Sequence, residues 1–355
     1  MPMHLTLLPE FGWSINGQHV YGPGSVFQGF VTVKNMPSHS RITKIKLAFS
    51  CVETILPYTI TPGIIRSTRK PIFLVAKILQ CDSTASAKSS YTFPFTLQLP
   101  MLQFPPSVKQ SYYQCEYKLV ATAVDMNLPD KIEIPVVYMP FIETSLLKSS
   151  MLLNTTINKE LAAAIKLYTL NFVPGDYLKA NIKINMSTPE KKYKDMTVVT
   201  ELKQLTTILE FHDVPDQVKT VCSQTQALAM TSKNTPSTTD IELLLPADLT
   251  PSFVGNLVSV SYTLHIRLEH KGSLSSIWKQ ALKVIKIQVV VGTLGYGIRS
   301  SDALESYTRW NDDSSVESPM PSPIFIDSIE YEDALPLYES IKLPCYEGPT
   351  QCSSN

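Results

Sequence analysis

The chain has 355 residues, which exceeds one ordinary domain and predicts two. Charged residues make up 17% of it, below the roughly 25% of an average domain, and this shortfall favours β structure over long solvated helices. Lys plus Arg and Asp plus Glu both number 31, and without a clustered basic stripe this balance argues against nucleic-acid binding. There is no long apolar run and no basic segment with an apolar run behind it, so we expect a cytoplasmic protein.

The neutral total hides an uneven distribution of charge. Residues 301–355 hold 11 acidic side chains and only two basic ones, so residues 1–300 keep 29 basic and 20 acidic side chains. A mildly basic body suits an anionic membrane surface or acidic peptide segments. The alternative is that these positive charges are scattered solubilising residues.

Alternating apolar and polar residues predict half-buried strands in the first part of the chain. The clearest are Gly29–Val33 and Lys44–Phe49, and Ile132–Val137 ends the series. Pro and Gly turns bound these short runs, a pattern typical of antiparallel sandwiches. We therefore expect an N-terminal β-sandwich over residues 1–142, followed by a linker over residues 143–158.

The second part of the chain repeats this pattern over residues 159–297. Strands are predicted at Asn181–Ile184, Ser259–Ile266 and Lys283–Val291. Lys159–Tyr168, with three consecutive alanines, is the best candidate for a helix. Beyond it, residues 298–355 are rich in Ser, Asp and Pro, which predicts an acidic, disordered tail because so polar a segment cannot bury a core.

Landmarks occur twice in the same order. A Pro-Gly turn at Pro23 precedes an alternating strand, and Pro174 begins an equivalent turn and strand. Leu-Pro is followed by a serine and, ten residues later, by a tyrosine that opens a strand. These pairs are Ser107 with Tyr117 and Ser252 with Tyr262. The spacing predicts duplicated domains, and we expect each tyrosine ring to lie in the core while its hydroxyl ties a corner.

Together these residues resemble the α-arrestins, or arrestin-related trafficking adaptors, of the arrestin clan. The resemblance spans roughly residues 20–293 and rests on Tyr21-Gly22-Pro23-Gly24, Gly29–Val33, Phe93-Pro94-Phe95, Leu99-Pro100, Pro106-Ser107, Pro174-Gly175, Leu205, Leu245-Pro246, Pro251-Ser252 and Val291-Gly292-Thr293. It implies two immunoglobulin-like antiparallel sandwiches hinged at a short linker, without a catalytic centre, cofactor or metal. It further implies a C-terminal region that recruits the WW domains of a HECT-type ubiquitin ligase.

Two similar segments near the end of the chain suit that role. Leu335-Pro336-Leu337-Tyr338 and Leu343-Pro344-Cys345-Tyr346 lie eight residues apart. A WW domain holds proline in an aromatic groove and a following tyrosine in a second pocket. Leucine replaces the first proline of the family's P-P-x-Y pattern, so each copy is expected to bind more weakly, although two copies raise the effective concentration. The alternative is that both strings are accidental.

Phosphorylation is a second expectation for the tail. Ser318 and Ser322 each precede proline, as substrates of proline-directed kinases do. A phosphate there would add negative charge and would suit docking of the tail on the basic body.

No enzyme class is indicated. The G-x-S-x-G, H-E-x-x-H and P-loop motifs are absent. His265 and His270 lie five apart in one predicted strand, so they face opposite sides and cannot share a metal. The six cysteines form no C-x-x-C pair and are read as reduced thiols.

The leading hypothesis is an adaptor that links cytoplasmic segments of membrane cargo proteins to a WW-domain ubiquitin ligase and promotes endocytosis and sorting, peripherally at the plasma membrane or endosomes. The alternative is an arrestin-fold scaffold of a coat or retrieval complex that acts without a ligase. An enzyme built on a β-sandwich is the third hypothesis.

Overall fold

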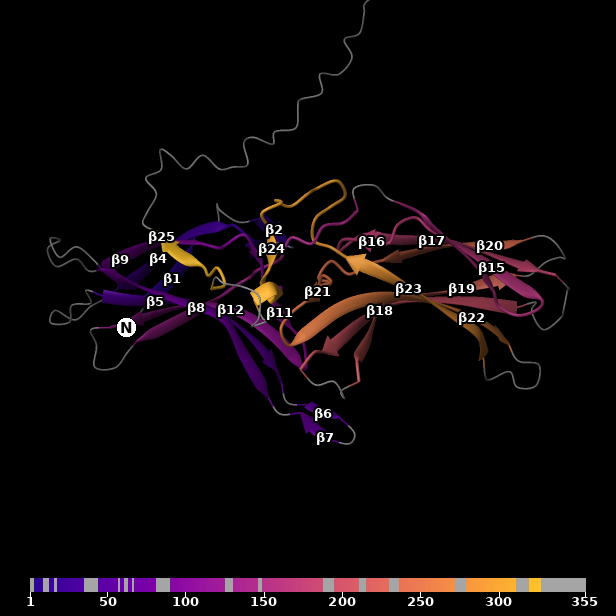
Figure 1. The fold of residues 1–355 in the computed structure, drawn as a ribbon, viewed down its shortest axis with the longest axis horizontal. Coiled ribbons are helices and arrows are strands. Elements are labelled where there is room, and N and C mark those ends of the chain that lie inside the picture. The colour runs from indigo at the N-terminus through magenta and orange to yellow at the C-terminus, as the bar shows by residue number, and fades with distance from the viewer. Residues whose placement is uncertain are drawn as a thin grey trace, which may run out of the picture.

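The computed structural model describes residues 3–326 except 9–12, 16–17, 35–43, 57, 61–62, 66, 81–89, 125–129, 146–148, 188–194, 211–214, 230–235, 272–278 and 311–318. Apart from one 3-10 turn, every regular element in these residues is a strand. Figure 1 shows two sandwiches end to end along the long axis of the molecule, the first in indigo and purple and the second in magenta and orange.

The first sandwich contains two antiparallel sheets. One has the order β1 (Met3–Leu7), β4 (Val26–Lys34), β9 (Ser90–Gln98) and β25 (Ile324–Ile326). The other has the order β11 (Val108–Lys109), β12 (Tyr113–Ala123), β5 (Lys44–Ile55) and β8 (Thr68–Gln80), with β13 (Lys131–Val136) also paired to β12. Alternate residues of β5 and β12 are buried between the sheets, as their period-2 pattern predicts.

The second sandwich has the same plan. One antiparallel sheet has the order β14 (Met151–Thr156), β15 (Leu161–Leu167), β17 (Tyr177–Met186) and β20 (Ser237–Leu244). The other has the order β16 (Asn171–Phe172), β23 (Lys279–Val291), β22 (Val258–Lys271), β18 (Asp195–Ile208) and β19 (Gln217–Ala229), with β21 (Phe253–Val254) paired to β22 and only β16 parallel to its neighbour.

The main strands of the two sandwiches are arranged in the same order. The order β8-β5-β12-β13 in the first corresponds to β19-β18-β22-β23 in the second, and β1-β4-β9 corresponds to β15-β17-β20. Corresponding strand pairs each contain a register shift, between β5 and β8 at Cys51/Val52 and between β18 and β19 at Leu202/Lys203. The duplication that the sequence landmarks predicted is therefore present in strand topology and in its irregularities.

Short elements lie around these sheets. The pairs β2 (Trp13–Ile15) with β3 (Gln18–Val20) and β6 (Tyr58–Ile60) with β7 (Gly63–Ile65) are hairpins, and Figure 1 shows β6 and β7 projecting below the middle of the molecule. β10 (Leu102–Gln103) pairs in parallel with β24 (Glu305–Ser306), which leads into the 3-10 turn η3 (Tyr307–Trp310).

The helix expected at Lys159–Tyr168 is wrong, because this segment contains strand β15. Its burial alternates along the strand, with Leu161, Ala163 and Ile165 inside the core. β15 pairs with β14 on one side and β17 on the other, so sheet hydrogen bonds and core burial outweigh the helix propensity of alanine.

The expected linker and tail are also partly folded. β14 lies within residues 143–158 and forms an edge of the second sandwich. β24, η3 and β25 lie after residue 298, and Figure 1 shows these yellow elements reaching back to the first sandwich. A few apolar side chains anchor them, because Tyr307 is 1% exposed and Phe325 packs against the core.

Candidate functional site

Each sandwich has a tyrosine corner. The Tyr117 hydroxyl donates a hydrogen bond to the carbonyl oxygen of Pro105 at 2.6 Å, and the Tyr262 hydroxyl donates to that of Thr250 at 2.5 Å. Both tyrosines are buried and each reaches 12 residues back along the chain. Burial raises the pKa of both phenols, so they remain neutral donors. The predicted structural role of these two residues is confirmed.

The connection between the sandwiches is hydrogen-bonded to the chain that leaves the second one. The Thr293 hydroxyl donates to the Pro140 carbonyl at 2.7 Å and accepts from the Ile142 amide at 2.8 Å. Glu143 accepts from the amide of Ser300 at 2.9 Å and also pairs with Arg299. Hydrogen bonds from Ser300, followed by those from Arg299, lower the pKa of Glu143 to about 2.

A buried carboxylate joins both sandwiches and the C-terminal segment. Glu53 of β5 is 0% exposed and accepts hydrogen bonds from the Tyr113 hydroxyl at 2.8 Å and from the Asn256 amide at 3.1 Å. The Tyr307 hydroxyl of η3 is 3.4 Å from the same carboxylate. Burial raises the pKa of Glu53, while hydrogen bonds from Tyr113, Asn256 and Leu257 and the charge of Lys70 oppose the rise.

Aromatic packing closes this junction. Tyr113 stacks on Phe253 of the second sandwich with centroids 6.3 Å apart, and Tyr307 packs on Phe104 at 5.9 Å. A Cβ on Gly255 would lie 2.4 Å from the Glu53 carboxylate, so only glycine permits this approach. The relative placement of the two sandwiches therefore depends on residues of all three chain segments.

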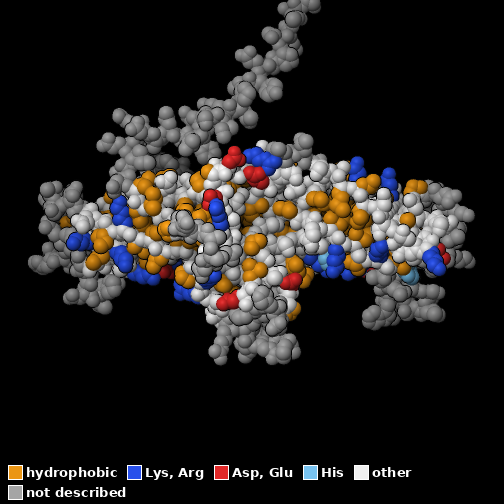
Figure 2. Space-filling model, in the orientation of Figure 1, with side chains coloured by type: hydrophobic (Ala, Val, Ile, Leu, Met, Phe, Trp, Pro, Cys, Tyr) orange, Lys and Arg blue, Asp and Glu red, His pale blue; other side chains and the backbone are white. Residues whose placement is uncertain are grey.

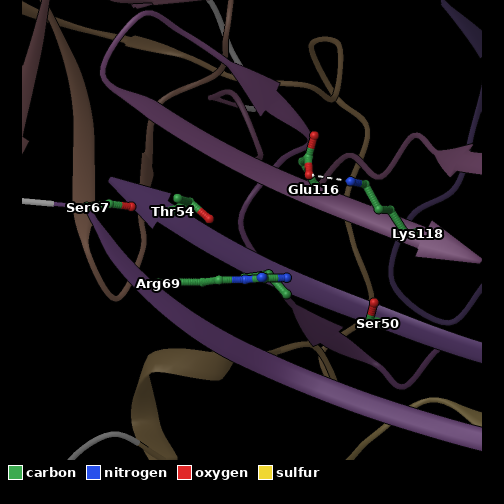
Figure 3. Close-up of a pocket in the computed structure, with 7 residues that line it drawn as sticks. Ser50, Thr54, Ser67, Arg69, Glu116 and Lys118 are labelled. Atoms are coloured by element: carbon green, nitrogen blue, oxygen red, sulfur yellow. Dashed lines mark ion pairs between the residues drawn. The ribbon is translucent and has the colours of Figure 1, made fainter. Parts of the chain in front are cut away.

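An open hollow of about 340 Å³ lies on the outer face of the β5–β8–β12 sheet. Its lining is Ser50, Val52, Thr54, Ser67, Arg69, Glu116 and Lys118. Figure 3 shows the Arg69 side chain extending toward β5, and the ion pair between Lys118 and Glu116, whose atoms are 2.8 Å apart. Hydroxyl and guanidinium donors thus converge on one open site.

The corresponding sheet of the second sandwich also carries basic side chains outside. His265 of β22 lies opposite Lys286 on β23 and Glu201 on β18. Partial burial, and then the charges of Lys203 and Lys286, lower the pKa of His265 and favour the neutral ring. Figure 2 shows Lys and Arg side chains along the lower edge of both sandwiches, with histidine beside them on the second.

The predicted WW-binding residues lie outside the described part of the chain. They are Leu335, Pro336, Tyr338, Leu343, Pro344 and Tyr346, and the predicted phosphorylation site Ser318 also lies outside. Ser322 is described: it is exposed, two residues before β25, and its hydroxyl donates to the Met320 carbonyl at 3.4 Å.

Within the described ranges, no cluster of three or more His, Cys, Asp or Glu residues could hold a metal ion. The described part of the chain also contains no helix that is long and apolar enough to cross a membrane. Cys51, Cys115 and Cys222 are free thiols, and the sulfurs of Cys51 and Cys115 are 3.7 Å apart in the core of the first sandwich.

Comparison with known proteins bears on the second sandwich. The family model described as "Arrestin (or S-antigen), C-terminal domain" matches residues 158–295. The second sandwich is similar to an arrestin C-terminal domain. The match covers β15 to β23. No curated protein sequence matches the chain.

Sequence reasoning missed Glu53 and Tyr307, two of the side chains at the contact between the arrestin-type domain and the rest of the molecule. A signal for Glu53 was present, because it occupies an inward position between Cys51 and Ile55 in the period-2 pattern of β5. A carboxylate at such a position must find donors or remain protonated. Nothing in the polar composition around Tyr307 indicated that its ring is buried.

Proposed function

We propose that the protein is an adaptor that links membrane cargo proteins to a WW-domain HECT-type ubiquitin ligase and so promotes ubiquitin-dependent endocytosis and sorting. The observation that carries this proposal is the arrestin C-terminal domain match, in a chain that has two such sandwiches. In this proposal the protein acts in the cytoplasm, peripherally at the plasma membrane or endosomes. The sandwiches bind cytoplasmic segments of cargo, and the two Leu-Pro-x-Tyr segments recruit the ligase.

The course of the C-terminal segment supports a short-range tether. β25 pairs with β9, which fixes residue 326 to the first sandwich. Leu335 follows Ile326 by nine residues, and nine residues span at most about 30 Å when extended. A ligase bound at the first Leu-Pro-x-Tyr segment would therefore stay close to cargo held on the first sandwich, and the second segment eight residues later gives a second attachment point.

The proposal is tested by titrating the full chain against isolated WW domains of a HECT-type ligase. We expect Tyr338→Ala and Tyr346→Ala each to weaken binding, and the double variant to abolish it, because the tyrosine fills the second WW pocket. Tyr331→Ala is the matched control, since this tyrosine lacks a Leu-Pro before it.

The proposed recruitment of a ligase would be wrong if the double variant still bound WW domains. It would also be wrong if the wild type showed no binding at several hundred micromolar. The arrestin-type fold would survive that result. The function would then be that of a sorting scaffold in a coat or retrieval complex, which needs no ligase.

A further inference from the structure

Strand β19 is a free edge of the second sandwich. It pairs with β18 on one side, and no other described strand pairs with it. Its register with β18 is regular over residues 222–229, and a bulge leaves Val221 without a partner on β18. Along residues 222–229, the backbone N–H and C=O groups that point away from β18 therefore have no ladder partner among the described strands.

This edge lacks the features that usually protect an exposed strand. Natural proteins place lysine, proline or other charged residues on such edges, or keep the edge strand very short, because an unprotected edge pairs with another chain. Residues 220–229 contain no Lys, Arg, Asp, Glu or Pro. On the outer side of the sheet, Ser223, Thr225 and Ala227 are small and exposed. No described side chain on this side of β19 would block an added strand.

The other long edges of the described sheets are protected. Charged or proline residues lie on each of them: Arg69, Lys70 and Pro71 on β8, Pro94 on β9, Lys131, Glu133 and Pro135 on β13, Asp240 and Glu242 on β20, and Lys283 and Lys286 on β23. β14 is uncharged, but Lys283 donates hydrogen bonds to the Thr155 hydroxyl and the Thr156 carbonyl on it. The remaining edge strands have five residues or fewer. In the described ranges, β19 is thus the one long edge strand without such protection.

On the inner side, several polar atoms beside this edge lack hydrogen bonds. The Oε1 atoms of Gln224 and Gln226 on β19 are buried without a hydrogen-bond partner in the described part of the chain, and so are the hydroxyl oxygens of Thr200 and Thr239. Thr200 lies directly opposite Gln224 on β18, and Thr239 belongs to β20, which contacts β19. Because buried polar atoms in folded proteins are nearly always hydrogen-bonded, this group of acceptors calls for a donor from outside the described residues.

We propose that β19 binds an extended segment of a partner protein as a further strand of the second sandwich, and that this segment carries side-chain amides at alternate positions. Its backbone completes the ladder along residues 222–229. Its inward-facing amide groups donate hydrogen bonds to Gln224 and Gln226 at the edge of the sandwich. The proposal rests on the proposed adaptor function in one respect, because the segment is taken to belong to the cytoplasmic part of a cargo protein.

The observations favour a peptide segment over a second copy of this chain. Pairing β19 of two copies would join the sandwiches along one strand whose exposed outer side chains are Ser, Thr and Ala. A contact along one such strand buries less than the roughly 1,200 Å² of a stable protein interface. A single extended segment needs less area, because backbone hydrogen bonds supply its affinity and alternate side chains supply its specificity.

The test combines the full chain with a synthetic probe of six residues that alternate glutamine and threonine, with a lysine at one end and a glutamate at the other. In hydrogen exchange measured by mass spectrometry, the bound probe should slow the amides of residues 221–229 about tenfold or more and leave those of β8 unchanged. A probe with two prolines at its centre should give no protection, because proline cannot donate to the ladder. A probe with alanine in place of glutamine should bind about fivefold or more weakly.

Two variants of the chain test the backbone and the side-chain contacts separately. Thr225→Lys should weaken probe binding about tenfold or more, because lysine on an edge strand opposes an added strand. Thr6→Lys is the matched control, since Thr6 is an exposed threonine on the edge strand β1 of the first sandwich, and it should bind the probe normally. Joint replacement by Gln224→Leu and Gln226→Leu should remove the preference for the glutamine probe over the alanine probe.

Four results would overturn the proposal. No protection of residues 221–229 at about 1 mM probe would mean that this edge does not add a strand. Equal binding by the wild type and Thr225→Lys would place the probe elsewhere, and equal affinity for the glutamine and alanine probes would remove the assigned amides. A dimer in light scattering, with residues 221–229 protected in the absence of probe, would assign the edge to a second copy of the chain.

These results are distinct from failure of ligase recruitment. WW-domain binding depends on Tyr338 and Tyr346 in the proposed function, so it should be normal in Thr225→Lys. Probe binding, in turn, should be normal in the double variant of Tyr338 and Tyr346.

Discussion

At the scale of single residues, a hydrogen bond from a buried phenol fixes one corner in each sandwich. Tyr117 and Tyr262 lie at equivalent positions, and each bonds a backbone carbonyl 12 residues earlier. The carbonyl that accepts this hydrogen bond has no partner in a strand, so the tyrosine hydroxyl satisfies it. The hydrogen bond thereby holds the connecting segment that contains the carbonyl in place. Because tyrosine occurs at the same spacing in both sandwiches, the structural role of this residue follows from the local fold of the corner.

Replacing either corner tyrosine with phenylalanine should destabilise the protein. Tyr117→Phe and Tyr262→Phe keep the ring but leave a buried carbonyl without its donor, at a cost of about 1–3 kcal/mol each in the free energy of unfolding. Denaturant unfolding measures the change, and Tyr168→Phe, at a 45% exposed tyrosine, is the control. Equal stability of all three variants would contradict a structural role for the corners.

At the scale of secondary-structure elements, the neighbouring strands with which a segment pairs decide whether it forms a strand. β15 contains three alanines in a row and yet is a strand, because β14 and β17 flank it and its alternate residues are buried. β25 has only three residues and depends on β9 in the same way. Phe325 lies opposite Leu97 and packs against the core, which anchors the C-terminal segment on the first sandwich.

Phe325→Asp should detach β25 from β9. A charge cannot replace the aromatic ring against the core, and losing its burial removes about 1.5–3 kcal/mol of local stability. Amide hydrogens in residues 96–98 should then exchange about tenfold to a hundredfold faster. Ile324→Asp is the control, because Ile324 is 54% exposed. Unchanged exchange in Phe325→Asp would show that β25 adds nothing to the stability of this edge.

At the scale of the whole molecule, Glu53 links the two sandwiches to η3. Burial raises its pKa above the ordinary value of 4.5, so the folded state binds a proton more tightly than the unfolded chain does. The contribution of Glu53 to stability is therefore fully present below the unfolded-state pKa and is lost as the pH rises through the raised folded-state pKa.

The free energy of unfolding should consequently contain a pH-dependent contribution from Glu53, and Glu53→Gln should remove that contribution. Relative to Glu53→Gln, the wild type should lose stability as the pH rises from about 4 through the raised pKa, since glutamine stays neutral. Thermal unfolding of both proteins across this range measures the difference. If the difference in stability between the wild type and Glu53→Gln did not change with pH, the Glu53 carboxylate would have an ordinary pKa. Its hydrogen-bond donors would then fully offset the effect of burial.

Much of the fold was predictable from local pattern. Period-2 alternation predicted the strands, and repeated turns and tyrosines predicted two similar sandwiches, because both signals arise from neighbours in sequence. The propensity of three alanines misled the assignment of β15, since its sheet partners lie elsewhere in the chain. The folded elements at residues 305–310 and 324–326 were missed for the same reason, because Tyr307 and Phe325 are buried against strands that lie far earlier in the chain.

The sequence by itself determined that this is an all-β protein of two related domains with an acidic end, because composition and short-range periodicity encode those properties. Only the tertiary structure showed that Glu53 meets Tyr113, Asn256 and Tyr307, and that Arg69, Thr54 and Lys118 line one hollow. These groups are far apart in the chain, and strand register and domain packing bring them together. No local pattern specifies that register, because it is set by the burial of the whole core.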